Sequence, residues 1–199
     1  MQIARLSRVI RLSMLIAAAL VSGAAVAHPH VWIKYAAQLR MRGTSVLAIK
    51  QMWRFTEGFP VQLVGIDALP DNGVLNAKQT AIFREQAFAS LAGAQYFSHL
   101  FVDGQPQQVL DPDDFRVSVE QGKVVYTFTL KLAKPVNVTG HQVALGIWDD
   151  SFFVDYEPDA AHAITLDGAA STCTAKPFAD RAHPIFNGIV VPQATAISC

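Results

Sequence analysis

Residues 115–132 read FRVSVEQGKVVYTFTLKL, and this stretch decides the fold class. Apolar and polar residues alternate from Phe115 to Val119 and again from Lys123 to Leu132, with Glu120-Gln121-Gly122 between the two runs. A period of two residues is typical of strands that bury one face, and a short glycine-containing connection between two such runs predicts a β-hairpin. The stretch therefore predicts an antiparallel sheet.

A second hairpin is predicted nearer the start of the chain. Apolar residues alternate from Val31 to Met41, Arg42-Gly43-Thr44 has the composition of a turn, and a returning strand is expected from Val46 to Thr56. The apolar face of the returning strand should carry Leu47, Ile49, Gln51, Trp53 and Phe55.

One helix is predicted, from Ala77 to Ala92, after a loop rich in Asp, Asn, Gly and Pro. Asn76 is a suitable N-cap, and Gln79 can reach back to it from the third helical position. Gly93 is expected to end the helix. An apolar stripe is expected to pack on a sheet and contains Ile82, Phe83, Ala87 and Leu91.

The rest of the chain is predicted to consist mostly of short strands, and Lys134-Pro135 is expected to end the long strand before it. The expected strands are Tyr96–Val102, Gln107–Leu110, Gln142–Trp148, Phe152–Tyr156 and Ala163–Leu166. Together these elements predict a mainly β (α+β) fold, an antiparallel β-sandwich-like domain with one inserted helix.

The first 27 residues have the features of a secretory signal peptide. Three arginines precede an apolar core from Leu12 to Leu20, and Ala25-Val26-Ala27 is a small-residue cleavage site. A retained membrane anchor is the alternative, but a span needs about 20 apolar residues and this run is shorter. We expect residues 1–27 to be removed and residues 28–199 to form one periplasmic domain, with no membrane span in the mature chain.

Cleavage after Ala27 would expose His28-Pro29-His30 as a metal-binding terminus. The α-amine and ring of His28 can chelate a metal, and the ring of His30 lies two residues on, on the same side of an extended chain. Pro29 has no backbone N–H, which blocks the binding mode that uses deprotonated amides. The alternative is that both histidines are solvated residues at the end of the chain.

A second candidate cluster runs from Trp148 to Glu157 and mixes four acidic residues with aromatic ones. Asp149 and Asp150 can complete a metal shell together with the terminal histidines, although acidic residues at a turn more often cap it. Four scattered histidines are each more often surface or core residues than ligands: His99, His141, His162 and His183.

The two cysteines, Cys173 and Cys199, fit an exported protein. In an oxidising compartment one disulfide between them is expected, and it would tie the end of the chain to the domain. Metal ligation by both thiolates is the competing role, but the spacing is not that of a C-x-x-C site.

Composition and motifs narrow the classes of function. The chain has 16 basic and 16 acidic side chains and no basic run of the kind that nucleic acid requires. It contains no nucleophile elbow, phosphate loop, H-E-x-x-H or C-x-x-C motif. The sequence therefore predicts neither nucleic-acid binding nor an enzyme.

Several short motifs, in order along the chain, resemble those of the DUF1007 proteins. They are His28-Pro29-His30-Val31-Trp32-Ile33, Trp53-Arg54-Phe55-Thr56-Glu57, Gly73-Val74-Leu75, Tyr96-Phe97 with Val102-Asp103-Gly104, and the segment Trp148–Val154. That family is described as a periplasmic component of an uncharacterised ABC-type transport system and often accompanies nickel/cobalt permeases. The resemblance implies a role in handling transition metals.

Three functional hypotheses follow from these observations. The first is a periplasmic accessory protein of a nickel/cobalt or zinc transport system, with His28 and His30 as metal ligands and a metal permease or ABC-type transporter as partner. Nickel, cobalt, zinc and copper all suit such ligands. The second is a metal-independent module that docks on the transporter, and the third is a copper enzyme that uses an N-terminal histidine brace.

Overall fold

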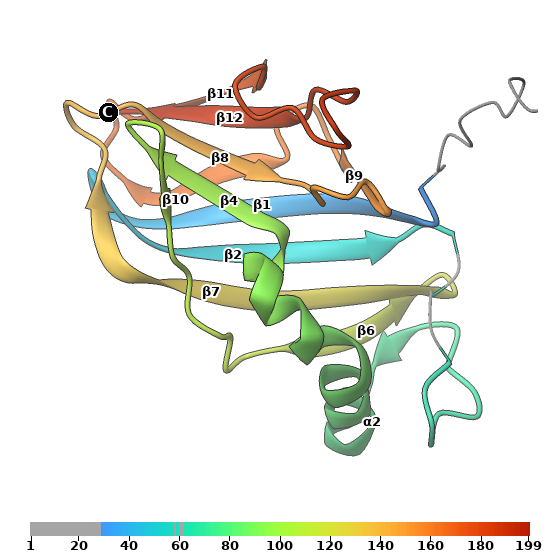
Figure 1. Cartoon of the computed structure of the whole chain (residues 1–199). Helices are drawn as coiled ribbons and strands as arrows, with labels where there is room; N and C mark the ends of the chain where they lie inside the picture. The colour runs from blue at the N-terminus through green and yellow to red at the C-terminus, as the bar shows by residue number, and fades with distance from the viewer. Residues whose placement is uncertain (1–28, 58, 60–61) are drawn as a thin grey trace, which may run out of the picture.

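The computed structural model describes residues 29–57, 59 and 62–199, and two β-sheets pack against each other in it (Figure 1). The first sheet has the order β10-β1-β2-β7-β6-β3, with β9 also paired to β1, and the second has the order β11-β12-β8-β4-β5. The first contains β1 (Val31–Gly43), β2 (Ser45–Phe55), β3 (Gly73–Val74), β6 (Arg116–Glu120), β7 (Lys123–Asn137), β9 (Val154–Pro158) and β10 (Ile164–Ala169). The second contains β4 (Ser98–Val102), β5 (Gln105–Gln107), β8 (Val143–Ile147), β11 (Thr174–Ala179) and β12 (Gln193–Ser198).

This architecture confirms the predicted β-sandwich-like α+β fold, and both hairpins form. Strand β6 returns as β7 with Glu120 opposite Lys123, and β1 returns as β2 with Leu39 opposite Ile49. Within the described part of the chain, no helix is long and apolar enough to cross a membrane.

Strand β7 does not end at Lys134-Pro135, and the expected break there is wrong. Ala48 of β2 pairs with Lys131, whereas Val46 pairs with Val136, so the register shifts and β7 carries extra residues at this point. Pro135 lies inside the shifted stretch, where a missing ladder N–H is tolerated. The same shift makes Val46 fully buried and leaves Leu47, expected on the apolar face, only half-buried.

Strand β1 also has neighbours that alternation did not predict. β9 and β10 both run parallel to β1 and follow one another along the same edge, with Val154 opposite Val31 and Ile164 opposite Ala37. The framework is therefore antiparallel-rich rather than purely antiparallel. Strands β3, β11 and β12 were not predicted, and β5 ends at Gln107 instead of extending to Leu110.

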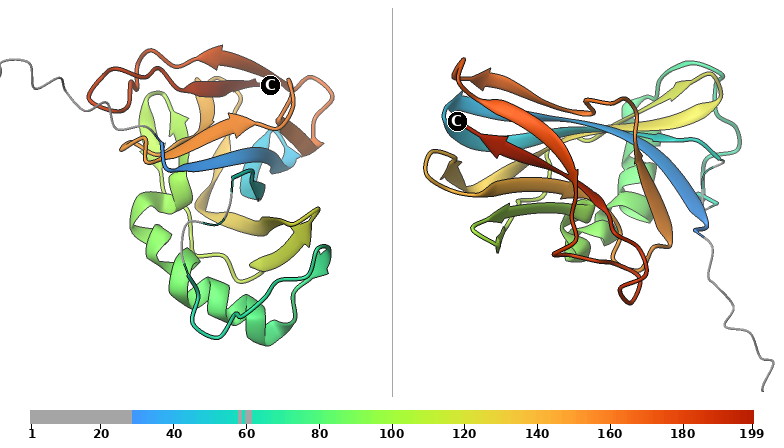
Figure 2. Two further views of the ribbon diagram at one scale, coloured as in Figure 1. Left: turned by 90° about the vertical axis from the view of Figure 1, so that its right-hand side faces the viewer. Right: turned by 90° about the horizontal axis from the view of Figure 1, so that it is seen from above.

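The helical segment packs on β7 of the first sheet, with Phe83 against Tyr126 and Phe88 against Phe128, and leads into β4 of the second sheet (Figure 2). Helix α2 (Ala77–Phe83) begins with the predicted capping box between Asn76 and Gln79. The coil then widens into a π-helical turn, η1 (Arg84–Phe88), and tightens into a 3₁₀ helix, η2 (Ala89–Phe97). The right-handed helical backbone ends at Gly93, as expected: Ala94, Gln95 and Tyr96 have non-helical φ and ψ angles, and the chain passes through a left-handed turn before β4.

A single large apolar core fills the space between the sheets, and aromatic rings dominate it. Trp53 of β2 is fully buried, with ring centroids 4.9 Å from Phe128 and 6.4 Å from Phe88. Phe88 from η1 is stacked on Phe115 at 4.1 Å, so the helical segment is anchored by aromatic packing.

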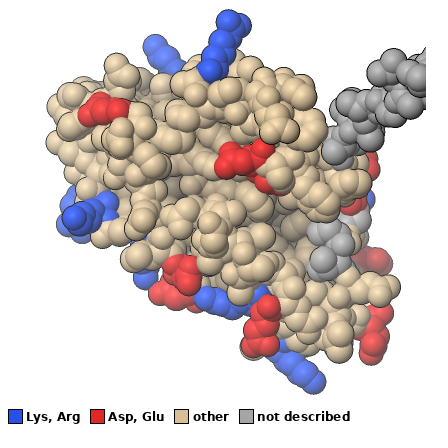
Figure 3. All heavy atoms as spheres, viewed as in Figure 1, with Lys and Arg blue, Asp and Glu red and all other residues tan. Residues whose placement is uncertain are grey.

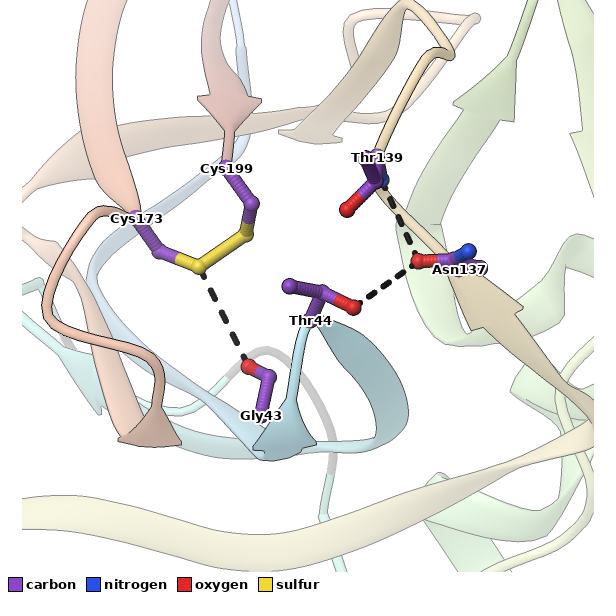
Figure 4. Close-up of a disulfide and its surroundings, with 6 residues drawn as sticks. All are labelled: Gly43, Thr44, Asn137, Thr139, Cys173 and Cys199. Atoms are coloured by element: carbon purple, nitrogen blue, oxygen red, sulfur yellow. Dashed lines mark hydrogen bonds between the residues drawn. A yellow bond between two sulfur atoms is a disulfide. The ribbon is translucent and has the colours of Figure 1, made fainter.

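The predicted disulfide joins Cys173 to Cys199 and closes a separation of 26 residues (Figure 4). It lies beside the β1–β2 turn, where the Sγ atom of Cys173 is 3.9 Å from the carbonyl oxygen of Gly43. The bond joins the start of β11 to the end of β12, two neighbouring strands of the second sheet in which Thr174 pairs with Ser198, and so fixes the end of the chain to the domain.

Candidate functional site

The described part of the predicted metal-binding terminus lies at the start of β1. The backbone N–H of His30 donates to the carbonyl oxygen of Phe153 at 2.9 Å, and the two rings are 5.0 Å apart. His30 is exposed, and Val31 is the first residue paired with β9. His28 lies outside the described residues. The parallel pairing of β1 and β9 therefore places His30 beside the turn that contains Asp149 and Asp150.

Asp149 holds this turn together. Its carboxylate accepts hydrogen bonds from the backbone N–H of Ser151 at 2.9 Å, the Ser151 hydroxyl at 2.8 Å and the backbone N–H of Val154 at 3.0 Å. Only 7% of Asp149 is exposed. Asp150 accepts one hydrogen bond, from the indole N–H of Trp148 at 3.1 Å. A ligand role for these two residues stays a prediction; in the structure Asp149 acts as a turn residue.

Across the described ranges, no group of three or more His, Cys, Asp or Glu side chains is placed to hold a metal ion. His99 stacks on Trp148 at 4.3 Å, and burial lowers its pKa below the ordinary value. His183 is 2.8 Å from the buried Asp180, whereas His141 pairs with Asp103 on the surface. These histidines are partnered within the fold.

A cavity of about 460 Å³ opens beside the Asp149 turn and is the feature that sequence reasoning missed. This volume lies within the roughly 300–1,000 Å³ typical of small-molecule sites. Figure 3 shows that this face of the molecule is hollowed, with acidic side chains beside the hollow. The residues around the cavity are Val31, Ile33, Trp53, Phe55, Phe59, Gln86, Ala87, Ser90, Leu91, Phe97, Tyr126, Asp149, Ser151, Phe153, Val154 and Tyr156.

The chain reaches the cavity residue Phe97 through unusual backbone. Gln95, Tyr96 and Phe97 have φ angles of 51°, 51° and 52°, a left-handed conformation that costs about 1–2 kcal/mol for each non-glycine residue. The Gln95 side chain accepts a hydrogen bond from the backbone N–H of Val109, and the Tyr96 hydroxyl donates to Asp111 at 2.8 Å. These contacts hold the strained turn, which leads directly into the cavity residue Phe97.

A chain of buried hydrogen bonds links this turn to Trp53. The indole N–H of Trp53 donates to Gln51 at 2.7 Å, Gln51 donates to the Ser98 hydroxyl at 2.5 Å, and Ser98 donates to the carbonyl oxygen of Tyr96 at 2.9 Å. Gln51 and Ser98 are buried. The orientation of Trp53 in the cavity is therefore coupled to the left-handed turn.

The π-helical turn forms part of the wall opposite β1, through Gln86 and Ala87. Such turns frequently occur at functional sites. Gln86 is itself fixed, because its side-chain amide exchanges two hydrogen bonds with the backbone of Val64, at 2.9 and 3.1 Å. Both irregular segments of the helical region thus border the same cavity.

Two tyrosines supply the buried polar groups of the cavity. The hydroxyl of Tyr126 has no hydrogen-bond partner among the described residues, although Tyr126 is only 2% exposed. Burial raises its pKa well above the ordinary value. Burial also raises the pKa of Tyr156, with further contributions from the Asp149 carboxylate and Tyr126. Both hydroxyls are therefore protonated donors at neutral pH.

The sequence did not reveal this cavity because its lining residues come from segments far apart in the chain. Trp53 and Tyr126 occupy strand positions at which alternation alone predicts ordinary core residues. The aromatic segment Trp148–Glu157 was singled out as a candidate site, and Phe153, Val154 and Tyr156 from it do line the cavity. The high proportion of aromatic residues in this segment was the sequence feature that pointed to this part of the cavity.

Two comparisons place the chain among known sequences. It is 26% identical over 130 residues to an "Uncharacterized 15.5 kDa protein in trpE 3'region" of Spirochaeta aurantia, a match that covers 64% of this chain and 91% of that protein. A family model described as "Protein of unknown function (DUF1007)" matches residues 13–183. Since that match covers most of the chain, including β1 to β11 and the cavity, the protein belongs to the DUF1007 family.

Proposed function

We propose that the protein is a periplasmic accessory protein of a transition-metal transport system, and that the metal is cargo held at the His28-Pro29-His30 terminus. The observation that carries this proposal is the position of His30. Its backbone is fixed to Phe153 and its ring is exposed at the edge of the domain. A free amine and two imidazoles next to a rigid strand form a nitrogen-rich donor set suited to nickel, cobalt, copper or zinc.

The compartment and the ligand set have separate support. The disulfide between Cys173 and Cys199 fits an oxidising compartment such as the periplasm. Asp150 is the better candidate to complete the metal shell, because the Asp149 carboxylate already accepts hydrogen bonds on both oxygens within its turn. The proposed partner is a metal permease or an ABC-type transporter of the inner membrane.

The decisive experiment is calorimetric titration of the mature protein with nickel, cobalt, copper and zinc. Mass spectrometry of the exported protein should first give His28 as its first residue. Loss of even an outer-shell partner typically weakens metal binding 10–100-fold, so we expect His28→Ala and His30→Ala each to weaken binding at least about tenfold. The matched control is His162→Ala, which removes an exposed histidine elsewhere.

A protein that keeps Ala27 tests the role of the amine. It retains both histidine rings but moves the free amine away from His28, so chelation by amine and ring is lost and binding should weaken. Equal affinities for the mature protein and for His28→Ala and His30→Ala would overturn the proposal.

Metal-independent docking on a transporter is the second candidate, and one observation favours it. Phe153, a large apolar side chain on the rim of the cavity, is 51% exposed. In that case a permease would co-purify with the metal-free protein, Phe153→Ser would abolish co-purification, and His30→Ala would not.

A further inference from the structure

The cavity beside β1 adjoins the metal-binding terminus, since the ring of its lining residue Phe153 is 5.0 Å from that of His30, but His30 itself does not line it. The described residues of its lining include no lysine or arginine, and the aromatic side chains of Trp53, Phe55, Phe97, Tyr126 and Tyr156 form much of it. An aromatic cavity with a few fixed polar groups is the usual form of a small-molecule site.

The polar groups of the cavity define what its ligand must carry. Gln86 is bonded to Val64, Asp149 to its own turn, and the Ser90 hydroxyl to the carbonyl oxygen of Ala87. Tyr126 differs from them, because its hydroxyl is buried and has no partner among the described residues. A buried hydroxyl without a hydrogen bond is costly, and a ligand oxygen that accepts from it removes that cost.

The walls also show that the cavity is maintained at an energetic cost. Three consecutive non-glycine residues, Gln95 to Phe97, adopt left-handed backbone where the helical segment meets β4. Such strain persists only where the surroundings enforce it, and it is concentrated at binding and catalytic sites. Here the hydrogen bonds from Ser98 and Gln51 connect the strained turn to Trp53 inside the cavity.

We propose that this cavity binds an uncharged organic molecule with a ring or branched apolar body and one hydroxyl or carbonyl oxygen, which accepts a hydrogen bond from Tyr126. The apolar body lies among the aromatic side chains. Because no lysine or arginine is found among the described lining residues, anions are disfavoured. The carboxylate of Asp149 does not call for a cation, because its own turn already supplies it with donors.

The test uses the mature protein without metal and four matched fluorescent probes. They share a naphthalene ring: 2-naphthol carries a neutral hydroxyl, naphthalene has no polar group, 2-naphthoate is an anion, and 2-naphthylmethylamine is a cation at neutral pH. We expect 2-naphthol to bind at least about tenfold more tightly than each of the others, a difference of about 1.4 kcal/mol. Tighter binding of the anion or the cation would overturn the proposed ligand class, and so would no binding of 2-naphthol.

Three variants assign the binding to this cavity. Tyr126→Phe should abolish the preference for 2-naphthol over naphthalene while leaving naphthalene binding unchanged. Ala87→Phe, which adds a ring to the wall, should abolish binding of both. The control Tyr35→Phe removes the hydroxyl of another buried tyrosine outside the cavity lining and should change neither. An unchanged preference in Tyr126→Phe would overturn the role of that hydroxyl.

This proposal is independent of the metal-binding proposal. His30→Ala should leave probe binding unchanged, and Ala87→Phe should leave the metal titration unchanged. A protein that binds 2-naphthol but no metal would therefore contradict only the proposed function.

Discussion

The two ends of β1 are built in opposite ways. At Gly43 the chain turns tightly, the Gly43 carbonyl accepts from the backbone N–H of Ala170, and the disulfide lies alongside. Thr44 and Thr139 both donate to the side chain of Asn137, as Figure 4 shows. At Val31, by contrast, the strand borders a cavity with strained backbone beside it and with the Tyr126 hydroxyl, which has no partner in the part of the chain that the structure describes. We call the Gly43 end of β1 the closed end and the Val31 end, which borders the cavity, the open end.

This difference indicates that contacts important for stability are concentrated at the Gly43 end of β1 and candidate binding residues at the Val31 end. The closed end contains a disulfide between the paired strands β11 and β12, and we expect it to contribute much of the resistance to unfolding. The open end contains left-handed residues, a π-helical turn and a cavity, and left-handed backbone and cavities each lower the free energy of unfolding. Four changes test this division, from the largest expected effect to the smallest.

Replacing both cysteines, Cys173→Ala with Cys199→Ala, tests the closed end. The disulfide spans 26 residues, so its loss should lower the free energy of unfolding by about 3–4 kcal/mol in the chain-entropy model. Urea denaturation measures this, and the affinity for 2-naphthol should not change. A loss below about 1 kcal/mol, or weaker probe binding in the folded variant, would show that the two ends are not separate.

Asp149→Asn tests the turn at the open end. The carboxylate accepts from Ser151 and Val154 while nearly fully buried, and an amide cannot accept at both positions. We expect a loss of about 2 kcal/mol, since hydrogen bonds to a charged group are the stronger kind. The matched control Asp150→Asn keeps an acceptor for the single bond from Trp148 and should lose less than about 1 kcal/mol. Equal losses would contradict the role of Asp149 in the turn.

His99 is expected to make the stability of the fold sensitive to acid. Burial lowers its pKa in the folded state, partly offset by the Trp148 carbonyl and by Asp150 and Asp149, while His183 lowers it further. On acidification the unfolded chain therefore takes up this proton first. The contribution of His99 to the free energy of unfolding is therefore fully present above about pH 6.5, the ordinary histidine pKa. It decreases as the pH drops below this value, by at most about 1.4 kcal/mol per pH unit.

Urea denaturation of the native protein and His99→Gln at pH 7.5, 6.5 and 5.5 measures this contribution. The glutamine variant lacks the titrating ring, so its stability should depend less on pH across this range. Parallel pH dependences for the two proteins would contradict the contribution assigned to His99.

The closed end and the regular strands could be predicted from the sequence because local patterns specify them. The alternation around Gln121-Gly122 and Gly43 gave both hairpins, and Asn76 with Gln79 gave the start of α2. The break expected at Pro135 was wrong, since a register shift between β2 and β7 accommodates the proline. Such a shift depends on the partner strand and leaves no local pattern.

The open end could be predicted only in part, because it depends on contacts between distant segments. His30 and the Asp149 turn were both recognised, but their proximity follows from the parallel pairing of β1 with β9, which alternation does not encode. The left-handed turn at Gln95–Phe97 contains no glycine and is enforced by tertiary hydrogen bonds. That the Tyr126 hydroxyl has no partner among the described residues is likewise visible only in the folded chain.

Tyr126→Phe tests the open end with the smallest change, one oxygen atom. Because the Tyr126 hydroxyl is buried and has no partner among residues 29–57, 59 and 62–199, its removal should raise the free energy of unfolding by about 1 kcal/mol. The same change at Tyr96, whose hydroxyl donates to Asp111 at 2.8 Å, should lower it by about 1 kcal/mol. Urea denaturation of the two variants side by side gives opposite signs if Tyr126 is retained for binding at a cost in stability. A destabilised Tyr126→Phe would mean that this hydroxyl already stabilises the fold.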